Sequence, residues 1–146
     1  MKRLILTVFL SVLMFSTTSS KTTGMFAKIM TFSEENLERR IKEMGIAYPD
    51  VVLAQAKIET GYFTSEIFRE NNNMFGMKVA KQRETTAIGE NRNHAQYTSW
   101  IQSLIDYKLW QDKMIHKART KHAYLNYLKR NYAEDKDYIT KIKKLL

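Results

Sequence analysis

Glu59 is the residue of this sequence whose position best suits proton-transfer chemistry. It lies three residues after Ala56 and seven after Val52, so in a helix it would share their apolar face. At the C-terminal end of a helix the dipole disfavours a negative charge, and partial burial does the same, so both raise the pKa of a carboxyl. A carboxyl with a raised pKa can act as a general acid near neutral pH. The spacing therefore makes Glu59 a candidate general acid, with an exposed surface glutamate as the ordinary alternative.

A second group of candidate residues lies in the segment NNNMFGMK, at 71–78. Side-chain amides and a backbone opened by Gly76 supply hydrogen-bond donors and acceptors that suit sugar hydroxyl and acetamido groups, and Phe75 supplies an apolar face. Asparagine runs are also common in plain loops, so this segment taken alone predicts only a loop. Tyr97, farther along the chain, could stack on a sugar because it lies where a predicted hairpin ends.

The elements that would position these residues are mainly helical. Ser33 is a natural N-cap and Pro49 suits the first turn of a helix. Thr64 would cap a third helix, and Thr98 or Ser99 a fourth. Caps and apolar spacing together predict helices over about 33–45, 49–61, 65–70, 99–110, 121–130 and 135–146.

One segment between the helices has the composition of strands. Residues 85–88 and 94–97 flank the sequence GENRN at 89–93, which predicts a small β-hairpin with a five-residue turn. No internal repeat or linker divides these elements, so the prediction is one mainly α (α+β) domain over residues 32–146.

The N-terminus has the pattern of an export signal. Lys2 and Arg3 precede an apolar run from Leu4 to Phe15, and small residues follow. Twelve helical residues span only about 18 Å, short of a hydrocarbon core of about 30 Å. We therefore expect a signal peptide at 1–20 that is cleaved on export, a flexible lead at 21–31 and no membrane insertion afterwards. The location would then be the periplasm, the cell envelope or the extracellular space.

Composition narrows the classes of function. The chain has 146 residues, 44% of them hydrophobic, which suits one folded domain, and it has no cysteine, which excludes disulfides, thiol nucleophiles and cysteine-based metal sites. Its 24 basic and 15 acidic residues give a net charge of +9, which favours a polyanionic partner. Its three histidines lack metal-ligand spacing with carboxylates, so no metal is expected. The export signal and the absence of a recognition-helix or RNA-binding motif argue against nucleic acid.

Four motifs together resemble the bacterial N-acetylglucosaminidase domain of glycoside hydrolase family 73, which includes autolysins and flagellar wall hydrolases. They are AQAKIETGYF, NNNMFGMK, YTSWIQSLIDY and YAEDKDY, in that order from position 54 to position 138. The resemblance extends over about residues 32–146. None of the motifs would be specific alone, but their number and order make the combination specific.

The resemblance implies a lysozyme-like fold, with a helical lobe, a small hairpin lobe and a groove between them. It implies hydrolysis, without a cofactor, of the β-1,4 bond after N-acetylglucosamine in peptidoglycan. Glu59 matches the family's general acid, which protonates the glycosidic oxygen as an oxocarbenium-like centre develops. Asn73, Phe75 and Gly76 match groove-lining positions, and Tyr132 matches a tyrosine placed near the cleaved bond. We expect the protein to act as a monomer on glycan strands.

The second carboxylate of such a hydrolase is left open by the sequence. In the family it lies on the hairpin, where this chain offers Glu84 and Glu90, and Glu90 in the predicted turn could reach over the groove. If neither serves, assistance by the substrate's 2-acetamido group or a lytic transglycosylase reaction with Glu59 alone becomes the alternative. A third alternative is a non-catalytic module that binds cell wall.

Overall fold

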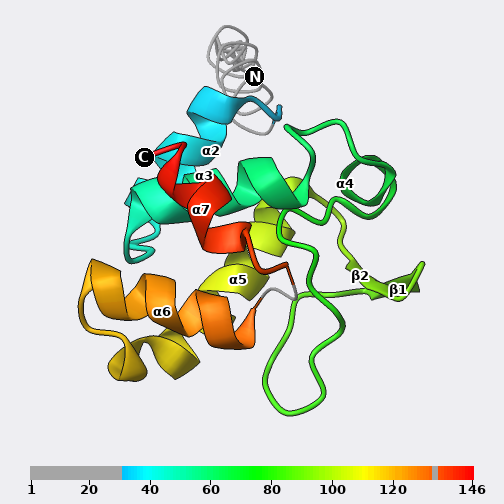
Figure 1. Ribbon diagram of the computed structural model, residues 1–146. Helices are drawn as coiled ribbons and strands as arrows, with labels where there is room; N and C mark the ends of the chain where they lie inside the picture. The colour runs from blue at the N-terminus through cyan, green and yellow to red at the C-terminus, as the bar shows by residue number, and fades with distance from the viewer. Residues whose placement is uncertain (1–30, 133–134) are drawn as a thin grey trace, which may run out of the picture. The chain divides into compact units, whose positions relative to one another are not determined.

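The computed structural model describes residues 31–132 and 135–146, and the unit from Phe32 to Leu146 contains helices and one small hairpin (Figure 1). The expected signal peptide and all but the end of the expected flexible lead lie outside the described residues. The helices are α2 (Glu34–Glu43), α3 (Pro49–Glu59), α4 (Glu66–Asn71), α5 (Trp100–Met114), the 3-10 helix η1 (Ile115–Lys117), α6 (Lys121–Asn131) and α7 (Tyr138–Lys143). The strands are β1 (Gly89–Asn91) and β2 (His94–Gln96). The mainly α class with a small hairpin is thus confirmed.

Side-chain caps begin most of these helices, as the sequence predicts. The Ser33 hydroxyl accepts a hydrogen bond from the backbone N–H of Asn36, and Ser99 does the same at the start of α5. The prediction of Thr64 as the cap of α4 is wrong, because Ser65 takes that position and Thr64 donates its hydroxyl to the Gly61 carbonyl oxygen at 2.6 Å. The Thr64 side chain is thus used in the turn before the helix.

The hairpin differs from the predicted one. Its strands pair in antiparallel register with Glu90 opposite Ala95, and the turn consists of Arg92 and Asn93 alone. Both turn residues have positive φ, 53° and 59°, the conformation of a tight turn whose twist matches that of the strands. The prediction of strands at 85–88 and of a five-residue turn is therefore wrong, and Glu90 lies in a strand.

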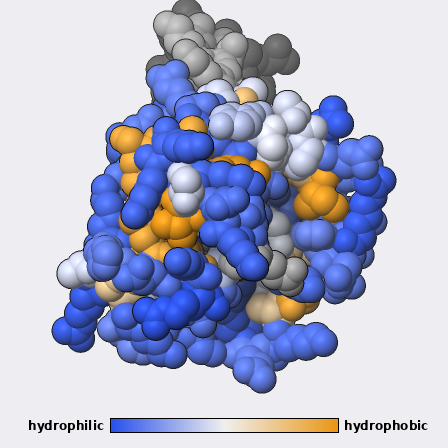
Figure 2. Space-filling model, viewed as in Figure 1, coloured by the Kyte–Doolittle hydropathy of each residue, from blue (hydrophilic) through white to orange (hydrophobic). Residues whose placement is uncertain are grey.

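The core is built from the inward faces of the helices. Its buried apolar side chains come from α2, α3, α5, α6 and α7, and include Leu37, Ile41, Val51, Val52, Ala56, Leu104, Tyr107, Tyr124, Leu128 and Ile142. In Figure 2, hydrophilic residues cover most of the visible face, and apolar residues show mainly in gaps between them. Within 31–132 and 135–146, the structure contains no helix with the length and apolarity needed to cross a membrane.

Candidate active site

Glu59 is the last residue of α3, and the chain turns sharply directly after it. The Thr60 hydroxyl donates to the Ala56 carbonyl oxygen at 2.6 Å and accepts from the Phe63 N–H at 2.9 Å, which fixes the turn. Gly61, Tyr62 and Phe63 all have positive φ. A turn built in this way ends the helix abruptly, so Glu59 comes to the wall of a cavity instead of continuing a helical surface.

This cavity, which we call the Glu59 cavity, has a volume of about 430 Å³. Its walls come from α3, the loop after α4, the segment before the hairpin, α5 and the end of α6. The lining residues are Glu59, Phe75, Gly76, Met77, Lys78, Ala80, Arg83, Trp110, Asn131 and Tyr132. Glu59 is the one carboxylate among them, and aromatic rings and two cationic side chains line the same cavity.

The surroundings of Glu59 favour its protonated form. Burial raises the pKa of the carboxyl, while a hydrogen bond from the Tyr138 hydroxyl and the charge of His94 act in the opposite direction, and burial prevails. The net direction is the one that a general acid needs, because the group must carry a proton when substrate binds. The environment thus agrees with the role predicted from helical spacing.

Tyr138 is held against Glu59 by a buried polar network. Its hydroxyl accepts a hydrogen bond from Gln55 Nε2 at 3.2 Å, which leaves its own proton for the Glu59 carboxylate. Gln55 Oε1 in turn accepts from the Tyr107 hydroxyl at 2.6 Å. All three side chains are buried, so the position of the Tyr138 hydroxyl is set by packing and by fixed partners.

The loop 72–78 passes close to the carboxyl because residue 76 is glycine. Gly76 has a φ of +63°, and a Cβ at this position would lie 3.1 Å from Glu59 Oε2. The preceding carbonyl oxygen, that of Phe75, accepts a hydrogen bond from the Tyr132 hydroxyl at 2.6 Å. Gly76, Phe75 and Tyr132 therefore line the same cavity as Glu59, with the Phe75 side chain almost fully buried.

Asn73 supports this loop from behind. Its side-chain amide donates to the carbonyl oxygens of Met77 and Ala95, and its Oδ1 accepts from the N–H groups of Phe75 and Met77. The side chain is 1% exposed and does not line the Glu59 cavity. The structure thus places Asn73 as the link between the loop and β2, with its hydrogen-bonding groups already used.

Tyr97 also lies outside the cavity lining. It is buried, and its hydroxyl donates to Asp106 Oδ2 at 2.7 Å. Asp106 forms a two-pronged ion pair with Arg83, with N–O distances of 2.6 and 3.0 Å. Tyr97 and Asp106 together therefore position Arg83, which does line the cavity.

Three residues of the cavity wall, Ala80, Arg83 and Asn131, were not predicted from the sequence, and for Trp110 the sequence favours a core position over stacking on a sugar. Trp110 is spaced like a core residue of its helix, and its ring is nevertheless half-buried at the cavity wall. A buried Asp106 requires a cationic partner, and this requirement was the available signal for a nearby arginine.

Glu90 and Glu84 are exposed, and neither lines the Glu59 cavity. The residue of the hairpin that does act on Glu59 is His94, through its charge. The described part of the chain contains no cluster of three or more histidine, aspartate or glutamate side chains that could hold a metal ion. The chemistry supported by this geometry is proton transfer from one carboxyl to a ligand held between Trp110, Tyr132 and the loop.

Comparison with known proteins identifies relatives of this chain. The model of the family described as mannosyl-glycoprotein endo-beta-N-acetylglucosaminidase (glucosaminidase) matches residues 35–146. The protein named Protein bax, from Escherichia coli K12, is 36% identical over 67 residues, which cover 46% of this chain and 24% of that protein. The chain thus matches about a quarter of the length of this relative.

Two solved structures share the fold. The catalytic domain of the autolysin Auto from Listeria monocytogenes aligns with a TM-score of 0.50 and 19% identity, covering 88% of this chain and 92% of that domain. A chain from a type VI secretion system effector–immunity complex of Pseudomonas protegens aligns with a TM-score of 0.53 and 20% identity, covering 81% of the present chain and 97% of that chain. At such identities the likeness shows the fold alone, a lysozyme-like arrangement of helices with a small hairpin.

Proposed function

Because this chain belongs to the mannosyl-glycoprotein endo-beta-N-acetylglucosaminidase family and is thus a glycoside hydrolase, we propose that it cleaves peptidoglycan glycan strands. The bond cleaved is the β-1,4 bond after N-acetylglucosamine. One structural relative is an autolysin, which supports a cell-wall substrate. A wall substrate also agrees with the export signal predicted at 1–20, which would bring the protein to the cell envelope.

The observation that carries the proposal is the placement of Glu59 in its cavity. Its carboxyl is the acid at the cavity wall, and burial raises its pKa. In the reaction, the Glu59 proton passes to the glycosidic oxygen as the bond from that oxygen to C1 breaks. Positive charge then develops on the sugar ring, and the Glu59 carboxylate takes a proton from the water that adds to C1.

The lining of the cavity favours a mechanism with one protein carboxylate. Of the residues that line it, Glu59 is the only acid, and Glu90 is exposed on β1. The oxygen of the substrate's 2-acetamido group can then attack C1 from the opposite face and form a cyclic intermediate that water opens. The protein need supply only Glu59 for this route.

The same observation favours a second candidate function, that of a lytic transglycosylase. There the bond cleaved would be the one after the muramyl sugar: Glu59 would first protonate its glycosidic oxygen and then, as a base, remove the proton of the C6 hydroxyl of that same sugar as this hydroxyl attacks C1. The product would carry an anhydro-muramyl end in place of a reducing end.

The test is digestion of purified peptidoglycan in heavy-oxygen water, with mass analysis of the fragments. Hydrolysis predicts reducing N-acetylglucosamine ends that carry one heavy oxygen, and the Glu90→Gln variant should release them at the wild-type rate. Anhydro-muramyl ends without heavy oxygen would replace the hydrolase by the transglycosylase. Binding to wall without any release of fragments would show a non-catalytic module and refute both enzymatic readings.

A further inference from the structure

A second hollow lies beside the Glu59 cavity, in a part of the chain that has basic residues and no acidic ones. Residues 113–133 contain six lysines or arginines and two histidines, with neither aspartate nor glutamate. This segment includes the end of α5, all of η1 and all of α6. Among its cations, Lys121 pairs with Asp50, and Lys113 donates to the Gln82 carbonyl oxygen. Two of the remaining cations, Lys117 and Arg130, line the hollow, and neither forms an ion pair among the described residues.

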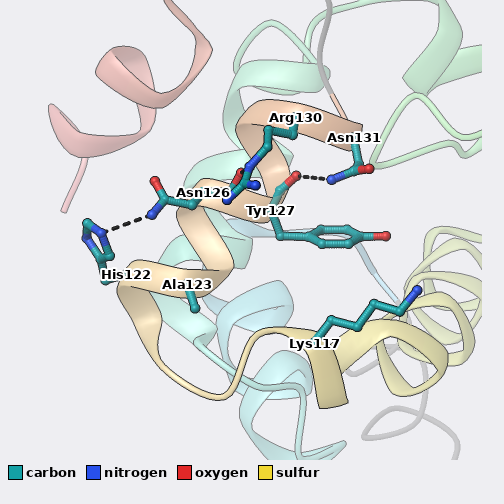
Figure 3. Close-up of a pocket in the computed structure, with 7 residues that line it drawn as sticks. All are labelled: Lys117, His122, Ala123, Asn126, Tyr127, Arg130 and Asn131. Atoms are coloured by element: carbon teal, nitrogen blue, oxygen red, sulfur yellow. Dashed lines mark hydrogen bonds between the residues drawn. The ribbon is translucent and has the colours of Figure 1, made fainter.

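The hollow, which we call the α6 cavity, has a volume of about 270 Å³. It lies between η1 and one face of α6, and Figure 3 shows the Tyr127 ring projecting from α6 toward the side on which the Lys117 amine lies. Arg130 and Asn131 stand one helical turn farther along the same face. Each of these four side chains lines the cavity.

The α6 cavity adjoins the Glu59 cavity. Asn131 lines both of them. Three aromatic rings form a series from one cavity to the other: the ring centroids of Tyr132 and Trp110 are 5.3 Å apart, and those of Trp110 and Tyr127 are 6.3 Å apart. A further hollow of about 320 Å³ shares Lys117 and Tyr127 with the α6 cavity and Trp110 with the Glu59 cavity. One ligand can therefore extend from Glu59 to α6.

The polar atoms of the α6 cavity are of two kinds. Lys117 has no ion-pair partner within the described chain, and Arg130 donates through Nε to the Asn126 carbonyl oxygen at 3.3 Å, which leaves its terminal nitrogens for a ligand. The Asn126 side-chain nitrogen forms a hydrogen bond with His122 Nε2, and the Asn131 side-chain nitrogen donates to the Tyr127 carbonyl oxygen. Their Oδ1 atoms thus remain as acceptors.

This combination indicates the chemistry of the occupant. Cationic donors bind carboxylates, and free amide oxygens accept hydrogen bonds from N–H groups. A peptide with acidic groups supplies both partners, whereas a phosphate polymer supplies acceptors alone and would leave the amide oxygens unpaired. The mixed set therefore fits an acidic peptide better than a phosphate chain.

We propose that the α6 cavity binds a carboxylate-bearing peptide branch of the same glycan strand whose sugar occupies the Glu59 cavity. The inference rests on the proposed function and adds a specificity to it. The protein would prefer strands that carry peptides over bare glycan, because Lys117 and Arg130 hold the branch while the sugar lies against Trp110 and Tyr132.

The test compares peptide-bearing peptidoglycan with the same glycan after enzymatic removal of its peptides. The double variant Lys117→Gln/Arg130→Gln should raise KM for the peptide-bearing strand about 5-fold, since two exposed charge pairs are lost, and leave kcat unchanged. On bare glycan its KM should equal that of wild type. The matched control is Lys129→Gln/Lys143→Gln, which removes the same charge from exposed positions outside the cavity.

The KM values distinguish recognition of a branch from general attraction of charge. Equal losses of affinity by both double variants, or an equal loss on both substrates, would overturn the proposal. Added glycerol phosphate polymer should compete only weakly at about 0.15 M salt, where screening reduces general attraction. Strong competition by this polymer that needs Lys117 and Arg130 would assign the cavity to phosphate instead.

A binding measurement keeps the inference independent of catalysis. Isotope-labelled Glu59→Gln protein is titrated with a soluble acidic glycopeptide and followed by NMR. We expect shifts at the amides of residues 117–131 that the double variant abolishes. Absence of these shifts would refute the peptide site even if the enzyme cleaves wall, while their presence without any cleavage would refute the proposed function alone.

Discussion

Glu59 shows how one carboxyl is adjusted by opposing local effects. Burial raises its pKa, and the Tyr138 hydroxyl and the His94 charge restrain that rise. A general acid in this setting is protonated over a wider pH range than an exposed glutamate, and it still ionises readily enough to act as a base in the following step. We therefore expect the tyrosine to act as a positioning residue that sets the working pH of the acid.

Replacing Tyr138 with phenylalanine should move the pH dependence of the reaction. Loss of the hydroxyl removes a donor to the ionised carboxylate, so the pKa of Glu59 rises further. Because the acid must be protonated, the alkaline limb of the kcat/KM profile should move to higher pH. Initial rates on peptidoglycan measured over a pH series check this. The control is Tyr62→Phe, at an exposed tyrosine, which should leave the alkaline limb at its wild-type pH. If the alkaline limb of Tyr138→Phe also stayed at its wild-type pH, the role of Tyr138 as a donor to the Glu59 carboxylate would be contradicted.

Gly76 can be tested against a glycine of matched conformation. Gly76→Ala should cost about 1 kcal/mol of stability from its positive φ. It should also lower kcat about 10-fold, because the new methyl group displaces the Glu59 carboxyl. Gly45→Ala has almost the same φ, +62°, and nothing within 4 Å of its Cβ, so it should lose the same stability and keep full activity. Equal activities of the two variants would show that the close approach at Gly76 is unimportant.

At the residue scale, the sequence predicts where a residue lies within its own helix or loop better than it predicts which residues of other elements it contacts. The place of Glu59 at the end of its helix could be predicted because helix spacing and the position of Gly61 are local properties. The surroundings of Asn73 and Tyr97 could not, because their partners Ala95 and Asp106 come from other elements. Both were predicted as substrate-binding residues, and the structure places them beneath the residues that line the cavity.

Among the elements, the loop 72–78 and the hairpin act as one structural unit. The Ala95 N–H donates to the Met77 carbonyl oxygen at 2.8 Å, and the Tyr97 N–H donates to that of Asn71 at 2.9 Å. The Asn73 side-chain amide also joins the loop to β2, because it donates to the carbonyl oxygens of both Met77 and Ala95. The position of the loop over Glu59 thus depends on the hairpin, although the hairpin contributes no lining residue to the cavity.

Asn73→Ala should therefore destabilise the protein and loosen the loop. It leaves buried backbone groups of Phe75, Met77 and Ala95 without a partner, so we expect a loss of about 3 kcal/mol in the free energy of unfolding. Urea denaturation of the two proteins measures this difference. Asn72→Ala is a comparison at a neighbouring residue with one side-chain bond, to the Tyr97 carbonyl oxygen, and should cost less. A smaller loss for Asn73→Ala than for Asn72→Ala would contradict the central place given to Asn73.

Elements with local start signals could be predicted well, and the hairpin could not. The caps at Ser33 and Ser99 are determined by the residues next to them, so the helices begin where expected. The hairpin register depends on whether Arg92 and Asn93 adopt positive φ, which asparagine tolerates but arginine only rarely does. Ionic contacts of Arg92 with Glu66 and Glu70 accompany this conformation, and they come from α4.

At the scale of the whole molecule, the buried Arg83–Asp106 pair joins the segment before the hairpin to α5. Burial raises the pKa of Asp106, but hydrogen bonds from Arg83, Tyr97 and Thr85 outweigh it and hold the pKa below the usual value. A carboxyl with a lowered folded-state pKa stabilises the fold above its unfolded pKa, about 3.9, and this contribution is lost as pH falls through the folded value.

Asp106→Asn should thus destabilise the protein in a pH-dependent way. At pH 7 we expect a loss of about 3 kcal/mol, because Arg83 keeps its buried charge without a counterion. The difference from wild type should shrink under strongly acidic conditions, where the wild-type carboxyl is itself protonated. Thermal unfolding over a pH series measures both effects. A difference that is independent of pH would show that the ion pair is not its source.

At this scale, a cavity lined by a single acid, Glu59, adjoins a hollow lined by basic residues, and three aromatic rings lie in sequence beside them. The family and the mainly α architecture could be predicted from four motifs in order, since motif order reflects the complete fold. The extension toward α6 could not, because it depends on how the Trp110 and Tyr127 rings lie relative to Tyr132. Packing between α5 and α6 sets that arrangement.

The rate of peptidoglycan cleavage by Glu59→Gln tests the central claim most directly. The change keeps the shape of the side chain and removes the transferable proton, so kcat should fall about 1000-fold. The variant should unfold at or above the wild-type temperature at pH 7, because burial already disfavours the ionised carboxyl, and Glu90→Gln should keep the wild-type rate. A Glu59→Gln protein that retains a third or more of the wild-type kcat would contradict the account.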